Sequence, residues 1–338
     1  MTIRITLPKV LAALPVLGLA LIAPAVLAQA GSGASALAAP ASTDHPAWAY
    51  PWAPNFTVPP ADDVPQHLPG STATFSWVQA RDLFFAPSWH PEDHPAMPEV
   101  VARGRKPDVR ACGSCHRAEG TGGPENSSLA GLPATYIAQQ MADIKSGARK
   151  FSGPQRGAVV LMTAAAKAIS DDEVQAAAAY FASLRPKRTI KVVESDSVPT
   201  TYVARLFYAK SPQGGTEPLG RRIVEIPDDV EQFELRDSRS MFTAHVPPGS
   251  VARGEVLVKT GGQGITVACA TCHGADLKGL GPIPRIAGRS PSYLMRQLFD
   301  IKNGARAGPG SAPMQATVAN LSEDDMMALA AYVASLPP

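Results

Sequence analysis

Cys269-Ala270-Thr271-Cys272-His273 and, 157 residues earlier, Cys112-Gly113-Ser114-Cys115-His116 are the two stretches that decide the fold of this chain. Both read Cys-x-x-Cys-His, the pattern of covalent c-type haem attachment. Two thiols one helical turn apart can each form a thioether to a haem vinyl group, and the adjacent imidazole is then placed to bind the iron. The sequence therefore predicts two covalently bound haem c groups, each with one of these histidines as an axial ligand.

Two other interpretations of the cysteines were weighed. The four thiols could hold a structural zinc ion, or each pair could be a redox-active dithiol. Neither interpretation explains why a histidine directly follows both pairs. The haem interpretation uses all four cysteines of the chain, so it leaves no free thiol for catalysis or for a disulfide.

The region after each motif is an internal repeat. Residues 112–149 align without a gap to residues 269–306, and 15 of the 38 positions are identical. Self-similarity at a fixed offset indicates a duplicated unit. We therefore expect two copies of one domain.

Two helices are predicted in each copy. Residues 135–146 and 292–303 have apolar and polar positions at helical spacing, and a glycine follows each segment. Farther along, Ser170-Asp171-Asp172-Glu173 and Ser322-Glu323-Asp324-Asp325 have the pattern of a capping box, and apolar residues at helical spacing follow both. Each copy should therefore end in an amphipathic helix with one buried face.

Met162 and Met314 stand at matched places before these capped helices. A haem iron that only passes electrons needs a sixth ligand, and a thioether on a loop across the haem face provides one while raising the potential. Methionine is more often a core residue, as we expect for Met141 and Met295 within the helices. We assign Met162 and Met314 as the second axial ligands.

At this point the chain resembles a known family. Each half is similar to a class I cytochrome c, and the whole resembles the tandem di-haem cytochromes c of bacterial periplasms, over about 97–185 and 250–336. In that family a proline carbonyl accepts a hydrogen bond from the haem-binding histidine, which implies this role for Pro284 toward His273. The first copy has Ser127 at the aligned place and departs from the pattern.

The predicted fold is mainly α. It comprises two class I cytochrome c domains related by internal duplication, with a small β-rich insert between them and an irregular N-terminal extension. Residues 46–95 are expected to lie across the first domain. The expected divisions are 1–30 signal peptide, 31–95 tether and N-terminal extension, 96–186 cytochrome c domain 1, 187–249 insert, and 250–338 cytochrome c domain 2.

The N-terminus has the layout of a secretory signal. Two basic residues precede an apolar run over 10–27, and small residues follow, so cleavage is expected after Ala28 or Ala30. The alternative is an uncleaved membrane anchor, which Pro15 and Pro24 argue against. We expect export to the periplasm and no transmembrane span in the mature chain.

Charge composition excludes one class of partner. Cleavage takes two of the 31 Lys and Arg residues and leaves 29, equal to the 29 Asp and Glu. The sequence holds no cluster of basic residues, so no nucleic acid partner is expected.

Two further regions leave alternatives open. Residues 188–193, 201–208 and 222–226 read as strands of the insert, which acts either as a brace between the domains or as a docking surface. His90 and His94 are four residues apart, but each precedes a proline, which disfavours a helix there. A hydrogen-bonding role is the first interpretation of this pair, and a metal-ligand role is the second.

The predicted function is an exported electron carrier without catalytic residues. Electrons would pass from a periplasmic dehydrogenase to a cytochrome or terminal oxidase. Arg149 and Arg306 are either partners of haem propionates or exposed residues that follow a helix. The alternatives are a di-haem enzyme, of the peroxidase or thiosulfate dehydrogenase type, and a dedicated cytochrome subunit of a dehydrogenase.

Overall fold

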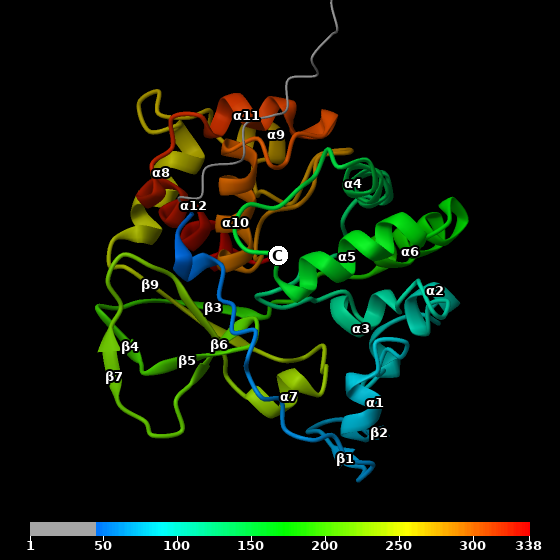
Figure 1. Cartoon of the computed structure of the whole chain (residues 1–338). Helices are drawn as coiled ribbons and strands as arrows, with labels where there is room; N and C mark the ends of the chain where they lie inside the picture. The colour runs from blue at the N-terminus through cyan, green and yellow to red at the C-terminus, as the bar shows by residue number, and fades with distance from the viewer. Residues whose placement is uncertain (1–44) are drawn as a thin grey trace, which may run out of the picture. The chain divides into compact units, whose positions relative to one another are not determined.

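The structure is a computed structural model that describes residues 45–338 (Figure 1). The predicted signal peptide and the tether up to residue 44 lie outside the described residues. Within residues 45–338, no helix combines the length and the hydropathy that crossing a bilayer requires.

The first repeat (96–186) is helical, as predicted. Its core gathers Val101, Leu132, Ile137 and Phe181 from segments far apart in the sequence. Its helices are α2 (Glu99–Ala102), α3 (Cys112–His116), α4 (Ala134–Ser146), α5 (Gly157–Ala168) and α6 (Asp171–Ser183).

The second repeat (250–338) has the same order of elements but a longer first helix. Its helices are α8 (Ser250–Thr260), α9 (Ala270–His273), α10 (Pro291–Lys302), the 3-10 turn η3 (Pro309–Ser311), α11 (Ala312–Val318) and α12 (Glu323–Ser335). Helix α8 packs directly on α12, because Gly254 lets the two backbones approach: a Cβ at this position would lie 2.0 Å from the Ala328 oxygen.

The predicted capping boxes are present in both repeats. The Ser170 amide donates to Glu173 Oε2 at 2.8 Å, and the Glu173 amide donates to Ser170 Oγ at 3.3 Å. The same pair of bonds joins Ser322 and Asp325, at 3.0 and 3.1 Å. Helices α6 and α12 therefore start where the sequence indicates, because their first free amides are satisfied by these side chains.

The insert contains strands, as predicted, and one short helix. Its main sheet has the order β3-β9-β8, in which β9 is parallel to β3 and antiparallel to β8. The elements are β3 (Ile190–Glu194), β4 (Ser197–Pro199), β5 (Thr201–Ala204), β6 (Phe207–Lys210), β7 (Thr216–Pro218), β8 (Val224–Pro227), α7 (Val230–Glu234) and β9 (Phe242–Val246).

One strand prediction is wrong. Residues 201–208 do not form a single strand, because the chain reverses at Arg205, whose φ is +60°. Strands β5 and β6 pair as a hairpin across this turn, with Thr201 opposite Lys210. The run of β-favouring residues predicts extended backbone correctly but carries no signal for the reversal.

The extension lies on both repeats, not only on the first. Tyr50 belongs to the core of the second repeat, where Arg296 Nη1 donates to the Ala49 oxygen at 2.9 Å. Farther along, the Ala111 amide donates to the Leu83 oxygen at 2.9 Å, which ties the extension to the first repeat. The expectation that residues 46–95 cover the first repeat is therefore wrong for the start of the segment, because its aromatic residues find their apolar surface on the second repeat.

The extension has only short regular elements of its own. They are the 3-10 turn η1 (Ala47–Ala49), strands β1 (Gln66–His67) and β2 (Thr74–Phe75), helix α1 (Trp77–Arg81) and the 3-10 turn η2 (Pro91–Asp93).

The insert contacts both repeats. Arg117, directly after the first motif, donates through Nη2 to the Phe233 oxygen at 3.1 Å. On the other side Ala334 of α12 joins the apolar cluster of the insert, which includes Ile190 and Phe242. These contacts are the ones that a brace between the repeats requires.

Candidate haem sites

The first site is a cavity lined by α3, α4 and α5 of the first repeat. Cys112, Cys115 and His116 form one wall, and Met162 of α5 lines the same cavity. Most of the remaining lining residues of the first repeat are apolar, among them Val109, Leu129, Ile137, Ile144, Leu161, Ile169, Val174 and Phe181. A flat apolar cofactor with one polar edge matches such a lining.

His116 is held by the backbone. Its Nδ1 lies 2.8 Å from the carbonyl oxygen of Ser127. Because a carbonyl only accepts, the proton is on Nδ1 and Nε2 carries the lone pair. Burial lowers the pKa of His116, against the raising effect of this hydrogen bond, so the imidazole is neutral. A neutral ring with a fixed tautomer is the form that binds a metal ion.

The second motif has the same arrangement. His273 Nδ1 lies 2.9 Å from the Pro284 oxygen, which is the contact implied by the family resemblance. Burial again lowers the pKa of the histidine. Ser127 and Pro284 are aligned, and both act through the backbone oxygen, so the replacement of proline by serine does not change the histidine's partner.

The cysteines do not behave as redox thiols. Burial, followed by the neighbouring Cys115, raises the pKa of Cys112 to about 12, and burial raises that of Cys269 to about 11. A reactive dithiol needs the opposite shift. The four cysteines also belong to two separate sites, and residues 45–338 contain no group of three or more His, Cys, Asp or Glu side chains that could hold a metal ion.

The two methionines occupy helices. Met162 lies within α5 and Met314 within α11, where it packs against the core of the second repeat. The expectation of a ligand on a loop is wrong in this respect, because the chain before each capped helix forms a helix of its own. Met141 of α4 also lines the first cavity, so two thioethers face that site.

Arg149 and Arg306 meet where the repeats contact each other. Both are buried, with about 9% and 8% of their surface exposed, so the alternative of an exposed arginine is wrong. The Lys150 amide donates to the Ala305 oxygen at 2.6 Å, and the Ala307 amide donates to the Ala148 oxygen at 2.8 Å. The two arginines thus form an antiparallel bridge between equivalent parts of the repeats.

Their side chains share two glutamines. The Gln140 Oε1 atom accepts from Arg149 Nη1 at 2.8 Å and from Arg306 Nη2 at 2.9 Å. The Gln297 Oε1 atom accepts from Arg149 Nη2 at 3.0 Å and from Arg306 Nη1 at 3.2 Å. Gln140 and Gln297 are equivalent in the two repeats, so this Arg–Gln cluster has approximate two-fold symmetry.

Equivalent tyrosines complete the Arg–Gln cluster. Arg306 Nη2 donates to the Tyr136 hydroxyl at 2.7 Å, and Arg149 Nη2 donates to the Tyr293 hydroxyl at 3.3 Å. Burial raises the pKa of the Tyr293 phenol, but Arg149, Arg289 and Arg306 outweigh burial and lower that pKa. This interface therefore holds more positive charge than its own acidic groups balance.

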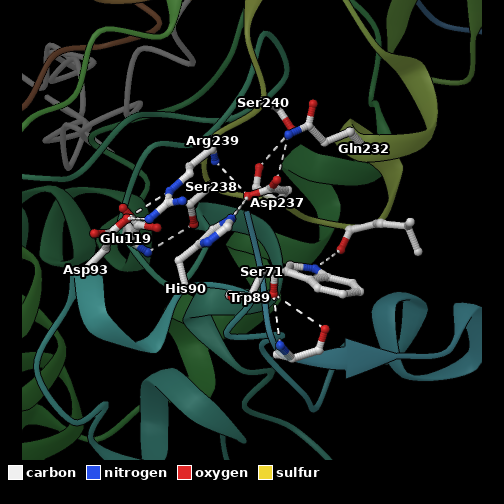
Figure 2. Close-up of polar contacts among 12 residues, drawn as sticks. Ser71, Trp89, His90, Asp93, Glu119, Gln232, Asp237, Ser238, Arg239 and Ser240 are labelled. Carbon is white, nitrogen blue, oxygen red and sulfur yellow. Dashed lines mark hydrogen bonds and ion pairs between the residues drawn. The ribbon is translucent and has the colours of Figure 1, made fainter. Parts of the chain in front are cut away.

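His90 and His94 lie away from the first cavity. His90 is buried between the extension and the insert, where its Nε2 lies 3.1 Å from Asp237 Oδ1 (Figure 2). The His94 Nε2 atom lies 2.8 Å from Ser88 Oγ. Neither histidine lines the cavity around His116. The metal-ligand interpretation of the pair is therefore wrong in the described structure, because the prolines keep them in a loop with hydrogen-bonding partners of its own.

The same region contains an ion-pair network that the sequence did not reveal. Asp93 accepts from Lys187 at 2.7 Å, and Lys187 also pairs with Glu119. Asp93 also accepts from Arg239 Nε at 2.9 Å (Figure 2). Three segments are joined here: the extension, the first repeat and the insert. The partners are far apart in the sequence, so no local pattern could indicate the network.

The sequence also missed Tyr50, Arg156 and Arg296, which line the first cavity. For Arg296 the sequence does contain a signal, because the residue lies on α10, the counterpart in the second repeat of the cavity-lining helix α4. Tyr50 has none, since it reaches the site from the other end of the chain.

These observations fit a covalently attached haem at each motif. Both motifs offer two cysteines and a neutral histidine with Nε2 available, and the first has an apolar cavity that Met162 also lines. The class of protein so defined is a tandem di-haem cytochrome.

Comparison with known proteins agrees with that class. A sequence profile of the family named cytochrome c matches residues 101–185 and 251–337, just over half of the chain. The chain therefore belongs to the cytochrome c family, with one domain of the family around each motif. It carries two covalently bound haem c groups and is a di-haem electron-transfer protein.

Relatives include proteins named cytochrome c4 and proteins named thiosulfate dehydrogenase electron acceptor. Cytochrome c4 of Azotobacter vinelandii is 27% identical over 250 residues, which span 72% of this chain and 91% of that protein. A thiosulfate dehydrogenase electron acceptor of Stutzerimonas stutzeri (strain A1501) is 40% identical over 85 residues, 25% of this chain and 38% of that protein. The solved structure of reduced recombinant cytochrome c4 from Pseudomonas stutzeri aligns at 25% identity and TM-score 0.43, over 67% of this chain and 93% of that chain.

Proposed function

We propose that this protein is an exported periplasmic electron carrier in which each haem iron is held by a histidine and a methionine. The axial pairs are His116 with Met162 and His273 with Met314. When bound, haem c supplies a one-electron iron couple. The observation that carries this proposal is the fixed histidine of each repeat, whose Nδ1 is bound to a backbone carbonyl and whose Nε2 is left for the metal.

In this proposal the protein holds and orients the ligands of each haem iron, and its side chains do not themselves react. Backbone carbonyls orient the rings at fixed positions and favour the neutral imidazole. A thioether as the second ligand favours the reduced iron, and ligands on both faces leave no open position for a substrate. The apolar lining of the first cavity keeps water away and so limits the reorganisation that accompanies each change of charge.

The class of protein and the names of its relatives support a proposal for the redox partners. We propose a periplasmic dehydrogenase as the donor and a cytochrome or terminal oxidase as the acceptor. Two relatives bear the name thiosulfate dehydrogenase electron acceptor, which favours a thiosulfate-oxidising enzyme as the donor. A permanent subunit of such an enzyme would differ from a free carrier only in affinity, and copurification from the native source separates the two.

The first experiment is the far-red absorption of the oxidised holoprotein, in which a weak sulfur-to-iron band reports methionine ligation. With the absorbance scaled to haem content, we expect the intensity of two methionine-bound haems. Met162→Leu and Met314→Leu should each remove half of the band. Each variant should also let carbon monoxide bind one reduced haem.

Matched controls are available in both repeats. Met141→Leu changes a second thioether that lines the first cavity, and Met295→Leu changes a buried core methionine of the second repeat. Both should keep the full band. If Met141→Leu loses half of it and Met162→Leu does not, the first axial pair is misassigned. A wild-type band of half intensity with peroxide turnover would instead indicate a di-haem enzyme.

A further inference from the structure

We propose that Arg156 binds a propionate of the haem attached at Cys112 and Cys115 (haem 1) and raises the reduction potential of haem 1 above the value that the rest of its site would give. This inference rests on haem 1 occupying the first cavity, as in the proposed function. It concerns a residue of the first repeat that lies beyond the gapless alignment of residues 112–149 with residues 269–306.

Arg156 is a buried cation without a protein partner. About 4% of the residue is exposed, and it lines the same cavity as His116 and Met162. Its Nε and Nη1 atoms are buried and have no hydrogen-bond partner among residues 45–338. Leaving charged donors buried and unpaired is strongly destabilising. A ligand with an acidic group removes that cost.

Three other arginines line this cavity, and two of them are already engaged. Arg149 donates to Gln140, Tyr293 and Gln297 in the Arg–Gln cluster. Arg296 donates to the backbone oxygens of Ala49 and Pro124. The third, Arg110, also has a buried Nε without a partner, but the residue is only half-buried and its guanidinium carbon lies 5.9 Å from the centre of the Phe84 ring. Arg156 is therefore the buried cavity arginine whose donors remain for a ligand, in preference to Arg149, for which the sequence suggested this role.

Two acidic side chains lie near Arg156. Asp300 accepts from the Ser152 amide at 2.8 Å and from the Tyr50 hydroxyl at 3.3 Å. Glu125 accepts from Asn126 through Oε1, and its Oε2 is buried without a partner. Neither carboxylate forms an ion pair with Arg156 within the described residues. No acidic group of residues 45–338 therefore satisfies Arg156, and a haem propionate has the charge and the oxygen acceptors that would.

The residues around Arg156 aim it at the cavity. The loop before it reaches Tyr50 at Gly153, where an added Cβ would lie 2.8 Å from the tyrosine ring, and the φ of +79° there suits glycine. The guanidinium carbon lies 5.7 Å from the centre of that ring. Tyr50 of the extension thus acts as a positioning residue for Arg156.

The second repeat has no counterpart of Arg156. Thirteen positions separate Arg149 from Met162, but only eight separate Arg306 from Met314, and no arginine lies between the latter two. The extra loop exists only in the first repeat. Haem 1 should therefore have a cationic partner in this loop, whereas the corresponding loop offers none to the haem attached at Cys269 and Cys272 (haem 2).

The chemistry of the pair sets the direction of the effect. Burial, followed by the nearby Arg296, lowers the pKa of Arg156 to about 9, whereas a carboxylate partner keeps the guanidinium charged. A paired propionate in turn remains ionised. A fixed positive charge beside haem 1 disfavours the ferric state, which carries one more positive charge than the ferrous state, and so favours reduction.

The test is a potentiometric titration of the holoprotein, in which each haem gives its own wave. Met314→Leu identifies the haem 2 wave, because it alters only that iron. We expect Arg156→Gln to weaken the electron affinity of haem 1 relative to haem 2 by about tenfold, equal to about 59 mV for one electron. The haem 1 wave should also become pH-dependent near neutrality, because burial raises the pKa of a carboxylate without a cationic partner.

Two variants act as controls. Arg156→Lys keeps the charge and should keep the haem 1 wave within twofold of wild type and nearly independent of pH. Glu125→Gln removes the unpartnered carboxylate of the same cavity. If Arg156 in fact serves Glu125, this variant and Arg156→Gln will shift the wave in opposite directions by similar amounts, and the proposal is wrong.

The proposal and the proposed function fail in different ways. A full far-red methionine band in Arg156→Gln shows that the axial ligands are intact. With that band present, an unchanged haem 1 wave, or equal shifts of both waves, overturns the role of Arg156. If Arg156→Gln does not fold, Arg156→Lys is the deciding variant, because lysine keeps the positive charge although it lacks the planar guanidinium. If the haem 1 potential of Arg156→Lys then varies with pH as it would for an unpaired propionate, the proposal is wrong.

Discussion

The two repeats differ clearly in the helix that precedes each haem-attachment motif. In the second, the 11-residue α8 packs on α12 through Gly254. In the first, the corresponding helix is the single turn of α2, and the extension covers the space: Ala86 lies so close that a Cβ at Gly113 would be 2.7 Å from it. The residues that hold the haem are retained in both copies, whereas a helix that supplies only packing has been replaced by another segment.

The replacement changes what surrounds each motif. Cys112 and Cys115 are half-buried, whereas Cys272 is exposed. The exposed apolar residues Val267 and Leu280 lie on either side of the second motif in the sequence. The first site is therefore the more sheltered of the two, although the histidines of both have the same kind of partner.

Gly254→Ala tests how far the second repeat depends on its long helix. The new methyl group would lie 2.0 Å from the Ala328 oxygen and 2.6 Å from Tyr332 Cβ, so α8 must move away from α12. We expect a loss of about 3 kcal/mol in the free energy of unfolding, measured by denaturant titration of the holoprotein. The first repeat should retain its far-red band under conditions that unfold the second.

Gly157→Ala is the control in the first repeat. The nearest atom to the new methyl group is the Trp52 ring at 4.0 Å, and the position is helical, so the free energy of unfolding should stay within about 0.5 kcal/mol of wild type. Equal effects of the two substitutions would show that α8 and α12 do not pack tightly.

Substitution of either arginine of the Arg–Gln cluster should lower the free energy of unfolding by a similar amount. Arg149→Met and Arg306→Met each remove a buried cation, one of the two arginine donors to each glutamine oxygen and the arginine donor of one tyrosine hydroxyl, at a cost of about 2 kcal/mol in the free energy of unfolding. Because Gln140 and Gln297 keep one arginine donor in either single variant and lose both in the double variant, the double variant should cost more than the sum. A denaturation cycle of the four proteins measures this coupling, and strict additivity would contradict a shared cluster.

Removal of a capping box should give the smallest change in the free energy of unfolding, and the size of this change should depend on pH. The Arg105 ion pair and the Ser170 bonds lower the pKa of Glu173 to about 2. A carboxylate with a lowered pKa stabilises the fold above its unfolded value of about 4.3, and this contribution is lost as the pH falls through 2. Ser170→Ala should cost about 1 kcal/mol at pH 7 and progressively less in acid, as thermal unfolding would show.

Ser322→Ala is the matched change in the second repeat. Burial raises the pKa of Asp325 there, but Ser322 and Arg253 outweigh burial and lower it. The same sign of pH dependence is expected, with a cost of similar size at pH 7. A cost that grew in acid would mean that the side chains of these boxes are not ionised in the folded protein.

The sequence predicted what local patterns control. The two motifs, the duplication, helices α4 and α10 and both capping boxes follow from spacing and from residue types that satisfy helix ends. The hydrogen bond from His273 to Pro284 was expected from the family resemblance and is present.

The errors concern contacts between distant segments. Tyr50 packs on the second repeat because an aromatic residue needs apolar surface, but its sequence does not say which surface. The burial of Arg149 and Arg306 depends on how two equal faces meet, and the reversal at Arg205 depends on pairing across a turn without glycine. Local propensity gives no information on such contacts.

The symmetry of the Arg–Gln cluster bears on how the contact between the two repeats depends on protein concentration. Two faces that present the same residues to each other form an isologous contact, the kind that joins two copies of one subunit in a dimer. Here both copies belong to one chain, so the contact forms at an effective concentration on the order of millimolar, whatever the number of molecules in the compartment. A single molecule therefore always presents both haems to a partner as a pair.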